Sequence, residues 1–220
     1  MAAEPAETYD DDPETAAAGA ERLNFFSDAV VAIAMTLLAL ELPVPEGRTP
    51  AEFWTGFAEN SGDYLAFLLG FLVIALHWRN HHRMMVYLRR SDSTLRLLDL
   101  LWLLTIVLMP FATKLLADGP PPDVEDSSRG ARFALYAALQ VLSYVLFVLM
   151  VRQMSRHGLA RGMPPGLVTA SERSVLLIAG GFAVSVPLFF VTHWAWICWA
   201  VGILLQGFWL RLTQRRHQVP

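Results

Sequence analysis

Six apolar blocks dominate the sequence, and each is long enough to cross a lipid bilayer. The hydrocarbon core is about 30 Å thick, so a spanning helix needs about 20 mainly apolar residues. The blocks are continuous rather than alternating in polarity, which favours helices over barrel strands, and only these two structures satisfy their backbone groups in lipid. We therefore predict an all-α membrane protein with six transmembrane helices. They cover residues 23–42, 63–86, 97–117, 131–151, 174–191 and 193–212.

The chain outside these blocks predicts two short tails. Residues 1–20 are acidic, rich in alanine and poor in large apolar side chains, and such a segment buries too little surface to order itself. We expect a disordered cytoplasmic tail at 1–20, a six-helix membrane domain at 21–213 and a second cytoplasmic tail at 214–220. The N-terminal segment lacks the basic region and short apolar core of a secretory signal.

The distribution of basic side chains predicts the orientation in the membrane. Cytoplasmic loops carry the excess of lysine and arginine. Of the 17 such residues, all but Arg48, Lys114, Arg129 and Arg132 fall at one side, before the first span, in the 2–3 and 4–5 connections, and after the last span. Both termini are therefore expected in the cytoplasm, in agreement with an even number of spans.

Composition argues against several classes of function. A net charge of -3 and a single lysine do not make the clustered basic surface that nucleic-acid binding needs. One cysteine excludes a disulfide framework or a zinc cluster built from cysteines. With no paired nucleophile and base, metal set or phosphate-binding loop in view, we expect a protein that is not an enzyme and has no cofactor or tightly bound metal.

The first span has two faces. At about 100° per residue, Ile33, Leu37 and Leu40 lie within about 60° of one another and Thr36 lies at the edge of the same stripe. Ser27 and Asp28 point away from it. A stripe of this kind is also typical of core packing or lipid contact. An acidic residue one turn inside an apolar span, however, needs a partner or water within the bundle.

The second span offers that partner. Its apolar part, residues 64–76, covers only about 20 Å, so the HWRNHH segment that follows must enter the inner edge of the bilayer. Three of its side chains share one helical face by their i, i+3 and i+4 spacing. We predict a buried hydrogen-bonded network, since buried polar groups are tolerated only when nearly all are paired. It joins Arg22, Ser27 and Asp28 to His77, Asn80 and His81, with the indole N–H of Trp78 as a further donor.

Two other interpretations of these residues stay open. His77 and His81 are spaced as half of a metal site, although no further Cys/His pair or HExxH pattern supports one. Alternatively, Asp28 and His81 exchange protons as a relay.

The combination Arg22-x-x-x-Phe26-Ser27-Asp28, an aliphatic first span and a second span ending in His77-Trp78-x-x-His81 resembles the prokaryotic branch of the transmembrane protein 175 family of potassium channels. The resemblance covers residues from about 21 to the C-terminus. It implies a bacterial plasma-membrane homotetramer that passes K+ along a central pore lined by the first helix, without the re-entrant filter loop of ordinary potassium channels.

The resemblance also implies roles for individual residues. Ile33 matches the narrowest hydrophobic constriction, Leu37 and Leu40 match further apolar rings, and Thr36 matches a hydroxyl layer associated with selectivity. An alternative for Thr36 is a hydrogen bond to the carbonyl of Ala32 within the helix. The polar residues of the motif match a structural network with the second span.

Physical reasoning supports a channel of this kind. The sequence has no TVGYG-like filter and no mid-span ring of acids, so a pore must select by other means. One slender helix cannot enclose a passage, which favours symmetric assembly. A ring of Ile33 side chains would act as a hydrophobic gate that excludes water, and K+ sheds its hydration more readily than Na+. We therefore predict a K+-preferring cation channel.

Two other classes of function remain possible. One is a proton-coupled secondary transporter in which Asp28, His77 and His81 titrate, although inverted repeats and broken midplane helices are not visible. The other is a membrane enzyme or a non-conducting scaffold. The sequence predicts no gating stimulus, since it has neither a ligand domain nor the arginine-rich helix of a voltage sensor.

Overall fold

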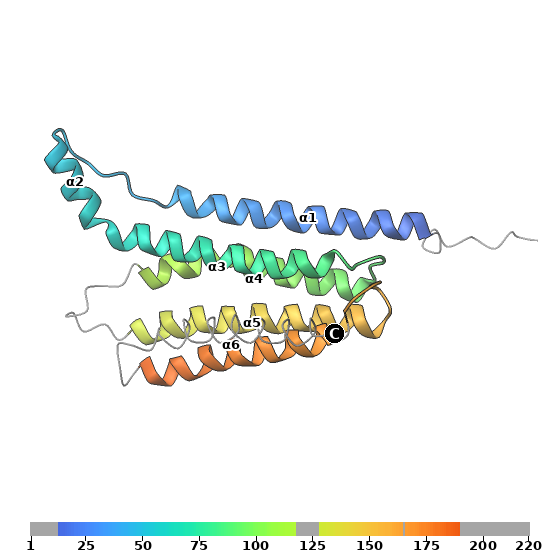
Figure 1. Cartoon of the computed structure of the whole chain (residues 1–220). Coiled ribbons are helices and arrows are strands. Elements are labelled where there is room, and N and C mark those ends of the chain that lie inside the picture. The colour runs from blue at the N-terminus through green and yellow to red at the C-terminus, as the bar shows by residue number, and fades with distance from the viewer. Residues whose placement is uncertain (1–12, 118–127, 165, 190–220) are drawn as a thin grey trace, which may run out of the picture.

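The computed structural model describes residues 13–117, 128–164 and 166–189 (Figure 1). These residues form the following helices: α1 (Pro13–Leu40), α2 (Pro50–Glu59), α3 (Ser61–Met85), α4 (Ser93–Ala117), α5 (Arg129–Arg156) and α6 (Leu167–Phe189). Within this part of the chain, α1, α3, α4 and α5 are long and apolar enough to cross a membrane. The prediction of an all-α membrane protein is therefore confirmed. The predicted sixth span, the tail at 214–220 and residues 1–12 lie outside the described residues.

The helices form a layered bundle with α4 at its centre. In Figure 1, α1 lies along one side, α3 and α4 lie in the middle, and α5 and α6 lie along the other side. α4 contacts α1, α3 and α5, and α6 packs on α5. The side chains of Trp102, Ile106 and Met109 on α4 are buried in the core. Because α4 touches three other helices, it positions α1 relative to the rest of the bundle.

The first helix starts earlier than the sequence analysis predicted. α1 begins at Pro13, so residues 13–20, which we had assigned to a disordered tail, are helical. Proline is favoured in the first helical turn, and the alanines that follow are the strongest helix formers. Most of the acidic residues that suggested disorder precede Pro13, and Glu14 in the first turn suits a helix N-terminus.

A short helix, α2, occupies the connection between α1 and α3 and was not predicted. A capping box starts it: the Thr49 side chain accepts a hydrogen bond from the Glu52 N–H, and the Glu52 carboxylate accepts one from the Thr49 N–H. The carboxylate also accepts a hydrogen bond from the Arg48 N–H at 2.8 Å. At 10 residues, α2 is too short for a search tuned to membrane spans.

Backbone pairing joins the two arginine-rich connections at the opposite end of the bundle. Leu88 and Ala160 form an antiparallel bridge. The Arg89 N–H donates to the Leu159 carbonyl and the Arg161 N–H donates to the Tyr87 carbonyl, each at 2.9 Å. The α3–α4 and α5–α6 connections therefore lie together, as expected of loops on one side of a membrane.

The close approach of α1, α3 and α4 depends on Gly70. A Cβ atom at this position would lie 3.1 Å from Thr113 Cγ2 and 3.4 Å from Leu38 Cδ2. We expect Gly70→Leu to destabilise the bundle by about 1–3 kcal/mol through overpacking, measured as a lower thermal unfolding midpoint in detergent. Gly62→Leu on the same helix is the matched control, because a Cβ there meets nothing within 4 Å. Equal midpoints for the two variants would contradict this close packing.

The capping box predicts a pH dependence at the start of α2. Hydrogen bonds from the backbone N–H groups of Arg48 and Thr49 hold the pKa of Glu52 below its ordinary value. A lowered folded-state pKa means that the carboxylate stabilises the cap at neutral pH and that this contribution is lost as the pH falls through the folded pKa. Hydrogen exchange of the Arg48 and Thr49 amides should be slower in the wild type than in Glu52→Ala at neutral pH. The difference should vanish in acid; a difference that persists there would argue against the cap.

Candidate functional site

The helix α1 divides its side chains between two faces. Ser27, Val31, Ala34 and Leu38 are buried against the bundle. On the other face, Ile33, Leu37 and Leu40 are 58%, 40% and 79% exposed. The apolar stripe predicted from the sequence is therefore open in the single chain, while the polar side of the same helix faces inward.

A buried carboxylate on α4 joins three helices. The Ser27 hydroxyl donates to Asp99 Oδ2 at 2.6 Å, and His81 Nε2 lies 2.8 Å from Asp99 Oδ1. The Leu23 carbonyl, 2.9 Å from the same hydroxyl, competes for its single proton. Ser27, His81 and Asp99 are all at most 1% exposed. Asp99 thus connects α1 to α3 and α4 where water does not reach.

Trp102 completes this cluster from the apolar side. Its ring stacks on His81 with ring centroids 4.2 Å apart and planes inclined by 7°, and it is fully buried. The stack fixes the plane of the imidazole, and the Asp99 carboxylate fixes which nitrogen faces α4. Two α4 side chains therefore hold His81: the Trp102 ring and the Asp99 carboxylate.

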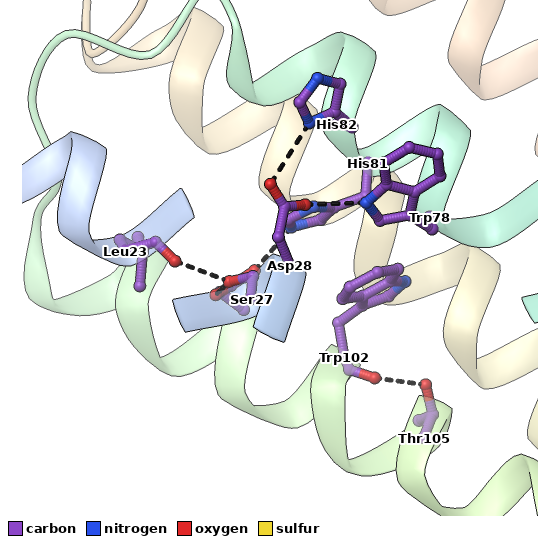
Figure 2. Close-up of polar contacts among 9 residues, drawn as sticks. Leu23, Ser27, Asp28, Trp78, His81, His82, Trp102 and Thr105 are labelled. Atoms are coloured by element: carbon purple, nitrogen blue, oxygen red, sulfur yellow. Dashed lines mark hydrogen bonds and ion pairs between the residues drawn. The ribbon is translucent and has the colours of Figure 1, made fainter. Parts of the chain in front are cut away.

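A second, more exposed cluster surrounds Asp28 at the same end of the bundle. Trp78 Nε1 donates to Asp28 Oδ1 at 2.8 Å, and His82 Nδ1 lies 3.5 Å from Asp28 Oδ2. Figure 2 shows the Trp78 and His82 side chains both directed at Asp28. The Trp78 and His82 rings stack on each other at 5.3 Å. The Asp28 and His82 side chains are 28% and 43% exposed in the single chain, so this cluster is less enclosed than the one around Asp99.

His77 belongs to a separate interior contact. Its Nε2 lies 3.0 Å from Gln140 Oε1 on α5, and Gln140 Nε2 donates to Met109 Sδ at 3.4 Å. The His77 ring also lies against Tyr144, with centroids 4.5 Å apart. His77 therefore ties α3 to α5 rather than to α1.

The contacts differ in part from the network predicted from the sequence. Ser27, Asp28, Trp78 and His81 do gather between α1 and the neighbouring helices, but the partner of His81 is Asp99 and not Asp28. Arg22 is exposed, and neither it nor Asn80 makes a side-chain hydrogen bond or ion pair within the described part of the chain. Phe26 is 51% exposed. Within the described residues, no three His, Cys, Asp or Glu side chains are grouped to hold a metal ion.

Three residues that the sequence analysis did not single out make these contacts. Asp99 and Gln140 are polar side chains inside the third and fourth apolar blocks, and that isolation was the signal that could have found them. His82 follows His81 directly, but it lies off the helical face that His77, Asn80 and His81 share. Trp78 and His82 are four residues apart and so share one face of α3, from which both side chains reach Asp28.

Thr36 lies on the exposed stripe of α1 with its hydroxyl turned back to the helix. Its Oγ1 donates to the Ile33 carbonyl at 2.8 Å, one residue along from the Ala32 carbonyl considered above. The proton is used within the helix, but the oxygen keeps its lone pairs for an outside partner.

Comparisons with known proteins find sequence and structural similarity to one family of ion channels. A family model described as "Endosomal/lysosomal potassium channel TMEM175" matches residues 22–110, which include α2, α3 and most of α1 and α4. The crystal structure of a lysosomal potassium-selective channel TMEM175 homolog from Chamaesiphon minutus is similar at a TM-score of 0.66 and 26% identity, covering 87% of this chain and 96% of that chain. The chain is thus similar to TMEM175 proteins in sequence over these residues and in fold. This is a family of ion channels rather than enzymes.

Relatives of known name come from bacteria and vertebrates. A potassium channel from Streptomyces collinus is 34% identical over 137 residues, or 62% of this chain and 65% of that protein. A chicken protein named an endosomal/lysosomal proton channel is 34% identical over 106 residues, or 44% of this chain and 21% of that protein. The matches thus cover less than two thirds of either relative's length.

The Asp99 cluster predicts a strong and specific effect on stability. Asp99→Ala leaves His81 Nε2 buried without its partner, while the Ser27 hydroxyl keeps the Leu23 carbonyl. A buried polar group left unpaired costs about 1–3 kcal/mol. We expect a large loss of folded protein in detergent unfolding measurements. Asp28→Ala should cost much less, because Asp28 and its partners Trp78 and His82 are only partly buried in the single chain. If the two variants unfold alike, Asp99 does not hold the bundle together.

Proposed function

We propose that the chain is the subunit of a potassium channel in which the first helices of four copies surround a central pore. Ile33 forms the constriction and gate, Leu37 and Leu40 form further apolar rings, and Thr36 contributes a hydroxyl layer. Residues 21–213 make the six-helix channel unit, which lies in a bacterial plasma membrane with both termini in the cytoplasm. The Streptomyces relative is named a potassium channel and the Chamaesiphon structure is that of a potassium-selective channel, which supports K+ as the permeant ion.

The single observation that carries this proposal is the pair of faces on α1. A polar side that is satisfied within the subunit leaves the helix free to present an apolar stripe outward, and Ile33 on that stripe is 58% exposed. Large side chains exposed in a row are typical of an interaction surface or a passage. One helix cannot enclose a passage, so symmetric copies are needed to close it.

A hydrophobic neck suits a K+ preference of modest size. Hydrophobic constrictions gate by dewetting, and an ion crosses such a neck only after losing part of its hydration. K+ holds its water less tightly than Na+, so the barrier is lower for K+. The Thr36 oxygen, whose proton is engaged by the Ile33 carbonyl, can offer lone pairs to the partly dehydrated ion.

In this proposal the interior contacts set the rotation of α1. Ser27 is fixed to Asp99 and Asp28 to Trp78, so the face carrying Ile33 is held away from the bundle. Rotation that moves Ile33 off the axis must stretch at least one of these hydrogen bonds. The network is therefore structural, and it also resists movement of the gate.

Replacing Ile33 with asparagine tests the pore directly. A polar ring should hydrate the neck, so we expect Ile33→Asn to raise single-channel conductance severalfold and to bring the K+/Na+ permeability ratio closer to one. Purified protein in planar bilayers with K+ and Na+ gradients gives both quantities. Ile33→Leu is the conservative control and should stay close to wild type. Unchanged currents in Ile33→Asn would remove this residue from the pore.

The same recordings separate a channel from a proton-coupled carrier. The carrier is worth testing because Asp28 and His82 form a close, partly exposed pair of titratable side chains and the chicken relative is named a proton channel. A passive K+ channel gives discrete current steps whose reversal follows the K+ gradient. Transport without such steps that follows an imposed pH gradient, and that is lost in Asp28→Asn, would favour the carrier.

A further inference from the structure

The short helix α2 displays an aromatic face that the bundle leaves uncovered. None of its residues is buried, and Phe53, Trp54 and Phe57 are 40%, 64% and 42% exposed. At about 100° per residue, these three side chains lie on one side, while Thr55 and Glu59 lie on the other. α2 is therefore amphipathic, although it contributes nothing to the core.

This helix is held firmly in place and is not a loose part of a loop. The Phe57 ring stacks on Tyr64 of α3 with centroids 4.4 Å apart, and the Tyr64 hydroxyl donates to the Pro43 carbonyl at 3.0 Å. The connecting segment lies close against the helix, because a Cβ at Gly47 would come within 2.6 Å of the Phe53 nitrogen. With the capping box at its start, α2 keeps one orientation relative to α3.

The position of α2 along the bundle fixes its depth. Asn60 alone separates it from α3, a helix long and apolar enough to cross the membrane. Leu65 and Leu68, within the first two turns of α3, are already 57% and 58% exposed. The apolar surface of a spanning helix thus begins directly beside α2, at the end of the bundle opposite the arginine-rich connections (Figure 1).

We propose that α2 is an interfacial anchor whose Phe53, Trp54 and Phe57 side chains insert among the headgroups and upper acyl chains of the adjoining leaflet. Tryptophan and other aromatic side chains favour this region of the bilayer, and amphipathic helices lie in its plane with the apolar face down.

The charge of α2 indicates which lipids it fits. The helix carries Glu52 and Glu59 and no basic side chain, whereas helices that bind anionic membranes are rich in lysine and arginine on their polar face. The surface therefore fits zwitterionic lipids such as phosphatidylcholine. The anchor stands independently of the proposed pore, because it requires only that α3 cross the membrane.

Site-directed spin labelling of the full-length protein in phosphatidylcholine nanodiscs tests this anchor. Single cysteines are introduced as Phe53→Cys and Trp54→Cys on the aromatic face, in a Cys198→Ala background that removes the one native cysteine. Thr55→Cys and Glu59→Cys are the matched controls on the polar face of the same helix. We expect the ratio of oxygen accessibility to nickel-chelate accessibility to be severalfold higher at 53 and 54 than at 55 and 59.

Two outcomes would overturn the proposal. High nickel accessibility at all four positions would place α2 in water. Low accessibility to both reagents at 53 and 54, with spin–spin broadening between copies, would show that a second copy of the chain covers the face. Should a cysteine variant fail to fold, quenching by brominated phosphatidylcholine gives an independent answer. The wild-type fluorescence should then show a quenched component that Trp54→Phe lacks, and no such component would also count against the anchor.

Discussion

The structure depends on one carboxylate that is buried among helices long and apolar enough to cross a membrane. Asp99 receives a hydrogen bond from Ser27 and lies against His81, so removing it would leave a buried polar group of α3 without its partner and would break the link to α1. Such groups are expensive in a medium that offers no water. The contact therefore makes the packing of α1, α3 and α4 specific as well as stable, since any other register would separate the carboxylate from its donors.

This specificity explains why α1 can carry two kinds of surface. Once Ser27 and Asp28 are satisfied on the inner side, the outer side needs no polar group and presents Ile33, Leu37 and Leu40 instead. The polar clusters lie toward the end of α1 that is beside the arginine-rich connections, and most of the apolar stripe lies toward its other end. A helix with this division can be firmly oriented by one part while the remainder contacts other partners.

The sequence was sufficient for the helical membrane class, for the long helices and for the two faces of α1, because apolar length and helical period are local properties. It was insufficient for the pairing of the polar residues. Asp99 and Gln140 come from separate spans, and only the packing of α4 and α5 shows that they reach His81 and His77. The start of α1 at Pro13 and the presence of α2 were missed for another reason. Both depend on caps and on alanine propensity, which a search for apolar length does not register.

The bridge between Leu88 and Ala160 has a mechanical consequence for the whole subunit. It links the connection of α3 and α4 to that of α5 and α6, so these four helices are clamped at one end in addition to their side-chain packing. Among the described residues, no backbone bridge of this kind reaches α1, which continues into residues 41–49 and packs on α3 and α4. The position of α1 therefore rests on side-chain contacts such as Ser27 with Asp99 and Asp28 with Trp78, whereas the other four helices are also joined through the backbone.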